Sequence, residues 1–372
     1  MRVPPALLLL ALLCLAVAAP ANARTAARLT LMPGVSYEQR VEFTSRGPVV
    51  YHVITAPRPG GLYSLRPYLA GNAILGREQR VTDIEKDVSP AATVAGVKGD
   101  LFSADGRPSG ILMRGGALDS PPIAGRSSVG FAGDGSLHID RIAYNGYWQG
   151  TGQRRVLGLN SAPLALNGVT LYTPAWGPAT PVEKGAVLEQ VLSPFPPTAP
   201  NSDLVATVTG PTQQTGGTQI PAGGAVLVAR GNQIPFLQTE APVGGRVKVR
   251  LTLTPGWAGI TDALGGGPLI VRGSKPVFRA NELFSTDLLA SRSPRTAVGQ
   301  LADGRIVLVA TDGGLPGYSV GMTNFELALT LQRLGAVTAS ALDSGASTAM
   351  AFDGTLLNRS SDRGGEQRVA EA

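Results

Sequence analysis

Two aspartates stand directly after two short apolar runs in the last third of the chain. Asp312 follows residues 305–311 and Asp343 follows residues 337–342. Continuous apolar runs of this length are typical of buried strands. If the strands are parallel, both carboxylates lie beyond the same edge of a sheet, about 5 Å apart for neighbouring strands or about 10 Å with one strand between. Either spacing allows two acids to flank a reacting bond; the alternative is that each aspartate opens a turn.

Small and hydroxyl-bearing residues follow Asp343 in the segment 344–350. Such a loop can direct its backbone N–H groups toward an anion. An arginine ahead of the first apolar run adds a guanidinium that suits bidentate contact with a phosphate, although a surface salt bridge is its alternative role. The candidate phosphate-binding residues are Gly345, Ser347, Thr348, Arg295 and Thr296.

A helix between the two apolar runs is predicted to make the strands parallel. Thr323 and Glu326 have the spacing of a capping box, which marks a helix start. Apolar residues then recur on one face over residues 327–334, and Gly335 is typical of a helix end. Strand, helix and strand at these lengths predict a right-handed βαβ unit.

The remainder of the chain has the composition of a strand-rich protein, with 48 Gly and 29 Pro among 372 residues. Strands are predicted at residues 48–55 and 62–69, and a short helix at 82–88 with Thr82 as its N-cap. A β-rich subdomain is predicted at about 171–256, inserted within the catalytic part. Its clearest strands are residues 225–230 and 245–253. The predicted fold class is α+β: a mixed sheet with packed helices and a C-terminal βαβ unit, plus the β-rich insertion.

Residues 1–23 have the features of a secretory signal peptide, with an apolar run at 6–19 and the small-residue sequence Ala21-Asn22-Ala23. A membrane-spanning helix would need about 20 apolar residues, so this run is too short. We therefore expect cleavage near Ala23, a secreted or extracytoplasmic location, no membrane insertion afterwards, and a domain at 24–372. The single cysteine, Cys14, lies inside the leader, so the mature protein is expected to have no disulfide.

The formal net charge of +6 suits an anionic partner, although ordinary solubility explains it equally well. Nucleic-acid binding is not predicted, because no run of Arg or Lys carries interleaved aromatic residues. The two histidines, His52 and His138, lack the spacing of metal ligands and are predicted to be structural. No cofactor or metal is predicted with a defined ligand set, although clustered aspartates are compatible with a divalent cation such as Ca²⁺. The sequence carries no signal for an oligomeric state.

A series of motifs resembles, in order and spacing, the phosphodiester glycosidase family. They lie at residues 265–268, 295–299, 312–313, 317–322, 326–328, 334–336, 342–343, 347–348 and 361–366. Upstream, residues 99–102 with Pro108 and Gly110 resemble the family's Asn-Gly-x-Phe-Phe loop. The resemblance extends from about residue 49 to 369 and implies hydrolysis of a sugar-1-phosphodiester to a free sugar and a phosphomonoester.

The resemblance also implies roles for single residues. Asp343 is expected to be the nucleophile or base, Asp312 its partner or a ligand of the sugar hydroxyls, and Arg295 the phosphate clamp. Because a phosphodiester is already an acidic leaving group, neutralising its charge should contribute more than protonating it. The further predicted site residues are Asp100, Lys98, Asp362 and Glu366. Lys98 stands where the family usually has Asn, and its ammonium suits a phosphate; for the three acids a turn or capping role is the alternative.

Ser344 and Ala346 stand where the family commonly has glycine. They favour an alternative function, a catalytically weak cell-wall carbohydrate-binding module of the same fold. A metal-dependent phosphodiesterase that cuts the P–O bond is a second alternative, and the absence of clustered histidines argues against it. The expected partner of the main hypothesis is a sugar-phosphate diester or an anionic glycopolymer of a cell wall or capsule.

Overall fold

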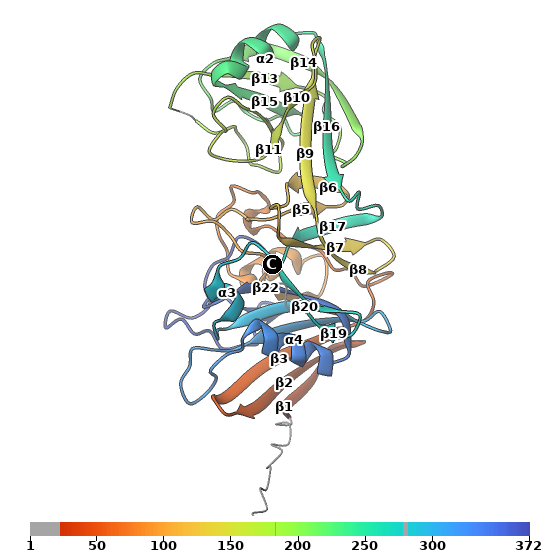
Figure 1. Cartoon of the computed structure of the whole chain (residues 1–372), viewed down its shortest axis with the longest axis vertical. Helices are drawn as coiled ribbons and strands as arrows, with labels where there is room; N and C mark the ends of the chain where they lie inside the picture. Colours follow the sequence, from red (N-terminus) through yellow and green to blue (C-terminus); the bar gives the residue numbers. More distant parts are fainter. Residues whose placement is uncertain (1–22, 183, 278–281) are drawn as a thin grey trace, which may run out of the picture.

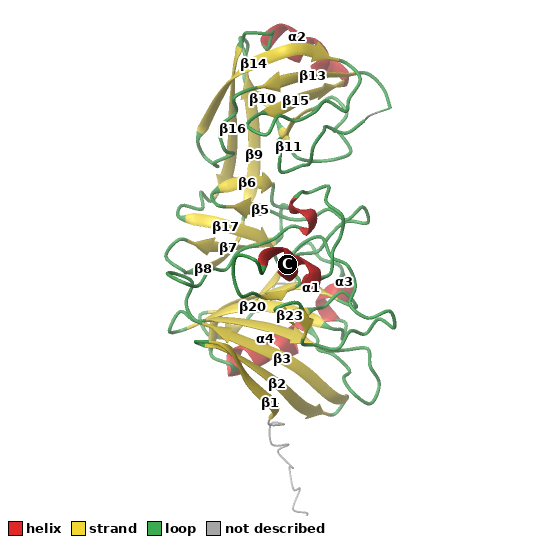
Figure 2. Ribbon diagram, turned by 180° about the vertical axis from the view of Figure 1, so that it is seen from behind, coloured by secondary structure: helices red, strands yellow, loops and turns green. Residues whose placement is uncertain are grey.

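The computed structural model describes residues 23–182, 184–277 and 282–372. The predicted signal peptide, apart from Ala23, lies outside the described residues. Three sheets follow one another along the long axis of the molecule, and the chain end marked C lies near its middle (Figure 1). Helices are few and short, and strands form the frame on both sides of the molecule (Figure 2). Within the described ranges, no helix is long and apolar enough to cross a membrane.

The main sheet has eight strands and lies at the lower end of Figure 1. In spatial order they are β1 (Arg24–Met32), β2 (Val35–Thr44), β3 (Gly47–Ala56), β21 (Ile306–Thr311), β20 (Arg295–Leu301), β22 (Ala336–Ser344), β18 (Gly267–Arg272) and β19 (Lys275–Pro276). The strand predicted at 48–55 is confirmed as β3.

The predicted βαβ unit is present with one difference. β20 lies between β21 and β22 and pairs antiparallel with both, so the two strands are parallel to each other without being neighbours. Among the described residues, all neighbouring strands of the main sheet pair antiparallel, so the prediction of a mixed sheet is wrong for this sheet. In another sheet, β11 and β12 form a parallel pair. The hairpin from β20 to β21 explains the difference. It places β20 beside β21, at the position that the second strand of a simple βαβ unit would occupy.

Helix α4 (Asn324–Arg333) connects β21 to β22 and packs on one face of the main sheet. Its capping box is formed as predicted, with the Thr323 hydroxyl accepting from the N–H of Glu326 and the Glu326 carboxylate accepting from the N–H of Thr323. Leu327 and Leu331 are fully buried against the sheet. The helix ends before Gly335, whose φ of +92° favours glycine.

A five-stranded sheet covers the opposite face of the main sheet. Its strands, in spatial order, are β6 (Ala117–Ser120), β5 (Leu112–Arg114), β17 (Ile260–Gly265), β7 (Ser127–Ala132) and β8 (Leu137–Arg141). Val129 and Ile139 of this sheet share a core with Ile54, Leu308 and Leu342 of the main sheet. The main sheet is therefore buried on both faces, which explains why its central strands are apolar without alternation.

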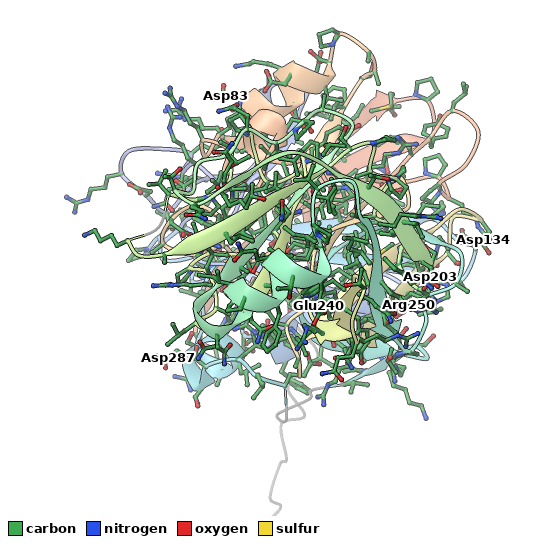
Figure 3. All side chains as sticks on the ribbon, turned by 90° about the horizontal axis from the view of Figure 1, so that it is seen from above. Asp83, Asp134, Asp203, Glu240, Arg250 and Asp287 are labelled. Atoms are coloured by element: carbon green, nitrogen blue, oxygen red, sulfur yellow. The ribbon has the colours of Figure 1, made fainter. Side chains whose placement is uncertain are left out.

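The second eight-stranded sheet occupies the other end of the molecule (Figure 1). Its strands, in spatial order, are β10 (Arg155–Val156), β9 (Ala143–Gln149), β16 (Arg246–Thr254), β14 (Asp203–Gln213), β13 (Val187–Leu192), β15 (Ala225–Arg230), β12 (Val169–Tyr172) and β11 (Gly158–Leu159). The strands predicted at 225–230 and 245–253 are confirmed. Asp203 of β14 and Arg250 of β16 form an ion pair of 2.9 Å and lie side by side in Figure 3.

The boundary predicted for the β-rich insertion does not coincide with the edge of this sheet. Residue 171 lies within β12, and three strands of the sheet come earlier in the chain, starting at Ala143. The long strand β9 pairs with β16 over seven residues, which places it in the sheet although its sequence carries no change of texture. Main-sheet strands lie on both sides of the sheet in sequence, before residue 57 and after residue 266.

Two further predictions are corrected. Residues 62–69 form no strand but two isolated bridges, at Tyr63 and Leu69, and Pro67 removes a backbone donor that a strand would need. Helix α1 (Val81–Val88) starts one residue earlier than predicted, so Thr82 lies inside it and is not the N-cap. The remaining helices are η1 (Ala70–Asn72), η2 (Gly231–Gln233), α2 (Ile234–Glu240) and α3 (Thr286–Ala290).

A small sheet positions the loop that follows β22. It consists of β24 (Thr355–Leu356), β23 (Met350–Phe352) and β4 (Ala95–Val97). β4 pairs antiparallel with β23, so residues 98–100 run past residues 343–349. This pairing brings residues that are about 250 positions apart in sequence to one place.

Candidate active site

Asp343 ends β22 with its carboxylate in contact with Lys98. Lys98 Nζ forms an ion pair with Asp343 Oδ2 and donates to Ser347 Oγ at 3.0 Å. Ser347 Oγ also lies 3.5 Å from Asp343 Oδ2. Lys98 is fully buried and Asp343 is 4% exposed. A carboxylate, an ammonium and a hydroxyl therefore meet at the end of one strand.

Backbone hydrogen bonds fix this meeting. The N–H of Lys98 donates to the carbonyl of Ala349 at 3.0 Å, and the N–H of Asp343 donates to the carbonyl of Gly99 at 3.1 Å. The hydroxyl of Thr296, on the neighbouring strand β20, donates to the Asp343 carbonyl at 2.7 Å. Because this hydroxyl proton is used by the Asp343 carbonyl, Thr296 orients Asp343.

The loop after Asp343 turns at a glycine. Gly345 has a φ of +95°, whereas Ser344 and Ala346 lie outside the left-handed region. The two residues that replace glycine therefore add no backbone strain. Within the described residues, no protein acceptor is found for the N–H groups of Ala346 and Ser347, which leaves both donors available to a ligand.

Asp100 lies beside this cluster in a space that two glycines create. It is 3% exposed, and a Cβ at Gly265 would lie 1.8 Å from its Oδ2, while one at Gly110 would lie 2.4 Å from the same atom. The close approach explains why glycine occurs at both positions, one in the 265–268 motif and one in the 99–110 segment. The backbone N–H of Asp100 donates to Glu371 Oε1 at 3.0 Å. Glu371 is a neighbour of the site that was not predicted from the sequence.

Replacing Gly265 with alanine is therefore expected to destabilise the protein. The added methyl group must displace the Asp100 carboxylate from a packed interior, which typically costs about 1–3 kcal/mol. Urea denaturation of Gly265→Ala against the parent measures the loss. Gly223→Ala is the matched control, because a Cβ there meets no atom within 4 Å and its φ is not positive. Equal stability of the two variants would contradict the packing described for Asp100.

Burial perturbs the three ionisable groups behind Asp343. It lowers the pKa of Lys98 to about 7, against the opposite effect of the Asp100, Glu371 and Glu78 charges. It raises the pKa of Asp100 to about 6, against the backbone N–H groups of Leu101 and Gly110. Burial, and then the charge of Asp100, raises the pKa of Glu371 to about 8. Clustered perturbed pKa values near neutrality are characteristic of catalytic sites.

Asp312 is held in a separate polar cluster at the end of β21. It is fully buried, and its Oδ2 contacts His52 Nε2 at 3.0 Å and accepts from the Tyr318 hydroxyl at 3.1 Å. Its Oδ1 accepts from the N–H of Arg359 at 2.9 Å and from Asn358 Nδ2 at 3.3 Å. Each oxygen therefore has two protein partners. Asn358 Nδ2 also donates to the Thr348 carbonyl at 3.2 Å, which links this cluster to the loop of Asp343.

Arg295 is not placed to clamp a phosphate. It is 1% exposed, and its guanidinium donates to the carbonyls of Leu288, Ser291 and Met322 at 2.7, 2.6 and 3.2 Å. Burial lowers its pKa to about 10. The side chain ties α3 and the residue that follows it to the segment before α4.

In the part of the chain that the structure describes, Asp362 and Glu366 form no hydrogen bond or ion pair with Asp343. Asp362 is partly exposed and accepts from the N–H of Gly364 and the side chain of Gln367 within its own turn. Glu366 accepts from the N–H and the hydroxyl of Thr82, at 3.1 and 2.7 Å. It therefore satisfies free N–H groups at the start of α1, where a negative charge is favourable. The turn or capping role, which is the alternative given above for these acids, accounts for the contacts of Asp362 and of Glu366.

The comparisons with known proteins fit this frame. Residues 199–372 match the phosphodiester glycosidase family. The resemblance to this family that the motifs predicted is thereby confirmed for the part of the chain that carries Asp312, Asp343 and Ser347. Lys98 and Asp100 precede the matched range, so their place in a phosphodiester glycosidase site depends on the contacts described above.

Two solved structures share the fold. A hypothetical protein from Synechocystis has a TM-score of 0.74 and 28% identity, over 92% of this chain and 62% of that one. A predicted exported protein from Burkholderia pseudomallei K96243 has a TM-score of 0.68 and 22% identity, over 87% of this chain and 73% of that one. An uncharacterized protein of Bacillus subtilis, derived from the SPbeta prophage, is 31% identical over 104 residues, which are 28% of this chain and 16% of that protein. The chain thus spans less than two thirds of the Synechocystis and B. subtilis proteins.

The structure brings together one part of the predicted phosphodiester glycosidase site. The residues joined by contact are Asp343, Lys98, Ser347, Thr296 and, through Gly99, Asp100. Thr348 flanks them with a buried hydroxyl that has no partner in the described structure. In the described residues, no group of three or more His, Cys, Asp or Glu side chains is arranged to hold a metal ion.

Proposed function

We propose that the chain hydrolyses the bond between the anomeric carbon of a sugar and a phosphodiester, at the site formed by Asp343, Lys98 and Ser347. The contact of these three side chains at the end of β22, in the range that matches the phosphodiester glycosidase family, is the observation that supports this function most directly. The mature protein is proposed to act outside the cytoplasm, in line with the features of residues 1–23.

Asp343 is proposed to be the reacting carboxylate. The paired Lys98 ammonium favours its ionised form, and its second oxygen accepts from the N–H of Ser344 at 2.6 Å, which fixes its direction. A carboxylate so placed can attack the anomeric carbon or activate a water molecule, and both routes pass through an oxocarbenium-like transition state.

The phosphate is proposed to lie over the loop 344–348. Lys98 and the free N–H groups of Ala346 and Ser347 can then neutralise the charge that develops on the leaving phosphate. Asp100, with a pKa raised to about 6 by burial, is a candidate second acid in the same turn as Lys98. Arg295, whose guanidinium donates to three backbone carbonyls, is proposed to take no part in binding the phosphate.

The chemistry is tested with sugar-1-phosphate diesters, including diesters of N-acetylglucosamine-1-phosphate. The expected products are a reducing sugar and a phosphomonoester, measured together in one time course. Products that still carry sugar-1-phosphate would indicate a phosphodiesterase, and binding without turnover would indicate a carbohydrate-binding module. Because Ser344 and Ala346 cause no strain in the loop, the structural reason to favour the binding module is removed.

A further inference from the structure

Glu371 lies against the turn that carries Lys98 and Asp100. It is 1% exposed; its Oε1 accepts from the N–H of Asp100 at 3.0 Å, and its carbonyl accepts from the N–H of Gly99 at 3.2 Å. On the other side of the same turn, the Gly99 carbonyl accepts from the N–H of Asp343 at 3.1 Å. Gly99 is therefore held between Glu371 and Asp343.

Glu371 packs closely against Gly99. A Cβ at Gly99 would lie 3.1 Å from both Cγ and Oε1 of Glu371. The second carboxylate oxygen, Oε2, is buried and has no hydrogen-bond partner in the described structure. Burying a polar atom without a partner costs stability, and such atoms in native proteins call for an explanation other than packing.

Three charged groups affect the pKa of Glu371. Asp100 and Lys98 lie in the turn 98–100, and Arg114 lies on β5 of the five-stranded sheet. The charge of Glu78 also affects the pKa of Lys98. The negative charge of Glu371 raises the pKa of Lys98, while burial lowers it. The protonation of Glu371 and that of Lys98 are thus linked.

We propose that Glu371 is a positioning residue of the active site: its side chain and its carbonyl hold the turn 98–100 so that Lys98 meets Asp343. This inference rests on the proposed function for its catalytic meaning. Within the described residues, Glu371 forms no hydrogen bond or ion pair with Asp343 or the loop 344–348, so it acts through the turn 98–100.

The test compares Glu371→Ala with the isosteric variant Glu371→Gln. Alanine removes the acceptor of the Asp100 N–H, whereas the amide oxygen of glutamine can still accept from it. We expect kcat of Glu371→Ala on a sugar-1-phosphate diester to fall by about tenfold, within the range that small displacements of catalytic groups produce, with KM little changed, and Glu371→Gln to keep most of the kcat of the parent. An equal loss of kcat in the two variants would overturn the positioning role.

A second readout is independent of activity. Since the pKa of folded Glu371 is raised to about 8 from an ordinary value of 4.5, its contribution to stability is present below pH 4.5 and is lost as the pH rises through 8. The Tm of Glu371→Gln minus the Tm of the parent should therefore increase between pH 5 and 8. Glu189→Gln is the matched control, because Glu189 is fully buried in the second sheet, bonded by the hydroxyls of Thr180 and Thr218.

The outcomes separate the two proposals. If the parent releases no sugar, the proposed function fails, and an equal Tm of Glu371→Ala and the parent overturns the hold of Glu371 on the turn independently of activity. If the parent is active and Glu371→Ala keeps the kcat of the parent, the positioning role is overturned while the proposed function stands. Glu189→Gln is expected to leave kcat unchanged.

Discussion

Replacing Asp343 with asparagine is expected to lower the rate of sugar release by about 10³-fold, the middle to upper part of the range for loss of a general acid or base. The amide has nearly the shape of the carboxylate, so the N–H of Ser344 keeps an acceptor, but the group can neither attack an anomeric carbon nor take a proton. Release of reducing sugar from a sugar-1-phosphate diester measures the effect. Most of the loss should appear in kcat, because the interaction that is removed acts in the transition state.

Asp343→Asn also leaves Lys98 without its ion-pair partner in a buried position. Breaking such a pair typically costs about 3–5 kcal/mol, but the low pKa of Lys98, about 7, allows it to lose its proton instead. Thermal denaturation must therefore accompany the rate measurement, so that unfolding is not mistaken for lost chemistry. Asp353→Asn is the control: Asp353 lies exposed in the turn between β23 and β24 with a φ of +47°, which asparagine tolerates. A folded Asp343→Asn protein with the rate of the parent would contradict the proposed function.

The parts of this site that the sequence predicted are those set by local patterns. The capping box at Thr323 and the apolar runs on either side of α4 are read within about 40 residues, and they place Asp312 and Asp343 beyond the same edge of the main sheet. The strand between them could not be foreseen, because β20 precedes β21 in sequence and its insertion depends on which strand the hairpin pairs with. Pairing between distant segments is not encoded in the periodicity of either segment.

The surroundings of each carboxylate depend on such distant pairings. Lys98 reaches Asp343 because β4 pairs with β23, and Glu371 reaches Asp100 by a contact across about 270 residues. Arg295 was predicted to be a phosphate clamp because a guanidinium suits a phosphate. In the structure, its N–H groups donate to three backbone carbonyls instead. The glycines at 110 and 265 carried a usable signal, since glycine inside a strand pattern indicates close approach of another group.

The surroundings of His52 also depend on a pairing between distant segments. The sequence predicted a structural histidine in a strand, and β3 does carry it, fully enclosed between Tyr37 and Asp312. Its contact with a predicted catalytic acid arises because β3 and β21 are neighbours in the sheet, in a register that pairs His52 with Ala310. The contact assigns Asp312 to a polar core beneath the loop, and its consequence is measurable as stability.

Replacing Asp312 with alanine is expected to lower the free energy of unfolding by about 3–5 kcal/mol, as breaking a buried charged network does. Four donors or partners lose their acceptor at once: His52, Tyr318, Asn358 and the N–H of Arg359. A buried polar group left without a partner costs the full free energy of its desolvation. The loss of stability should therefore exceed that of an ordinary substitution in the apolar core. Urea denaturation at neutral pH measures it, and Asp312→Asn, which retains one acceptor oxygen, should fall between the alanine variant and the parent.

The charge of Asp312 gives a second signature. Burial, and then this charge, raises the pKa of Tyr318 to about 12, so in Asp312→Asn the pKa of Tyr318 should move down toward 10. Alkaline titration of tyrosine absorbance in the folded protein follows this shift. Asp303→Ala is the control for stability, because Asp303 is an exposed turn residue beside Arg305 and its loss should change little. If Asp312→Ala were as stable as Asp303→Ala but inactive, Asp312 would belong to the catalytic machinery and the stabilising role assigned to it here would be wrong.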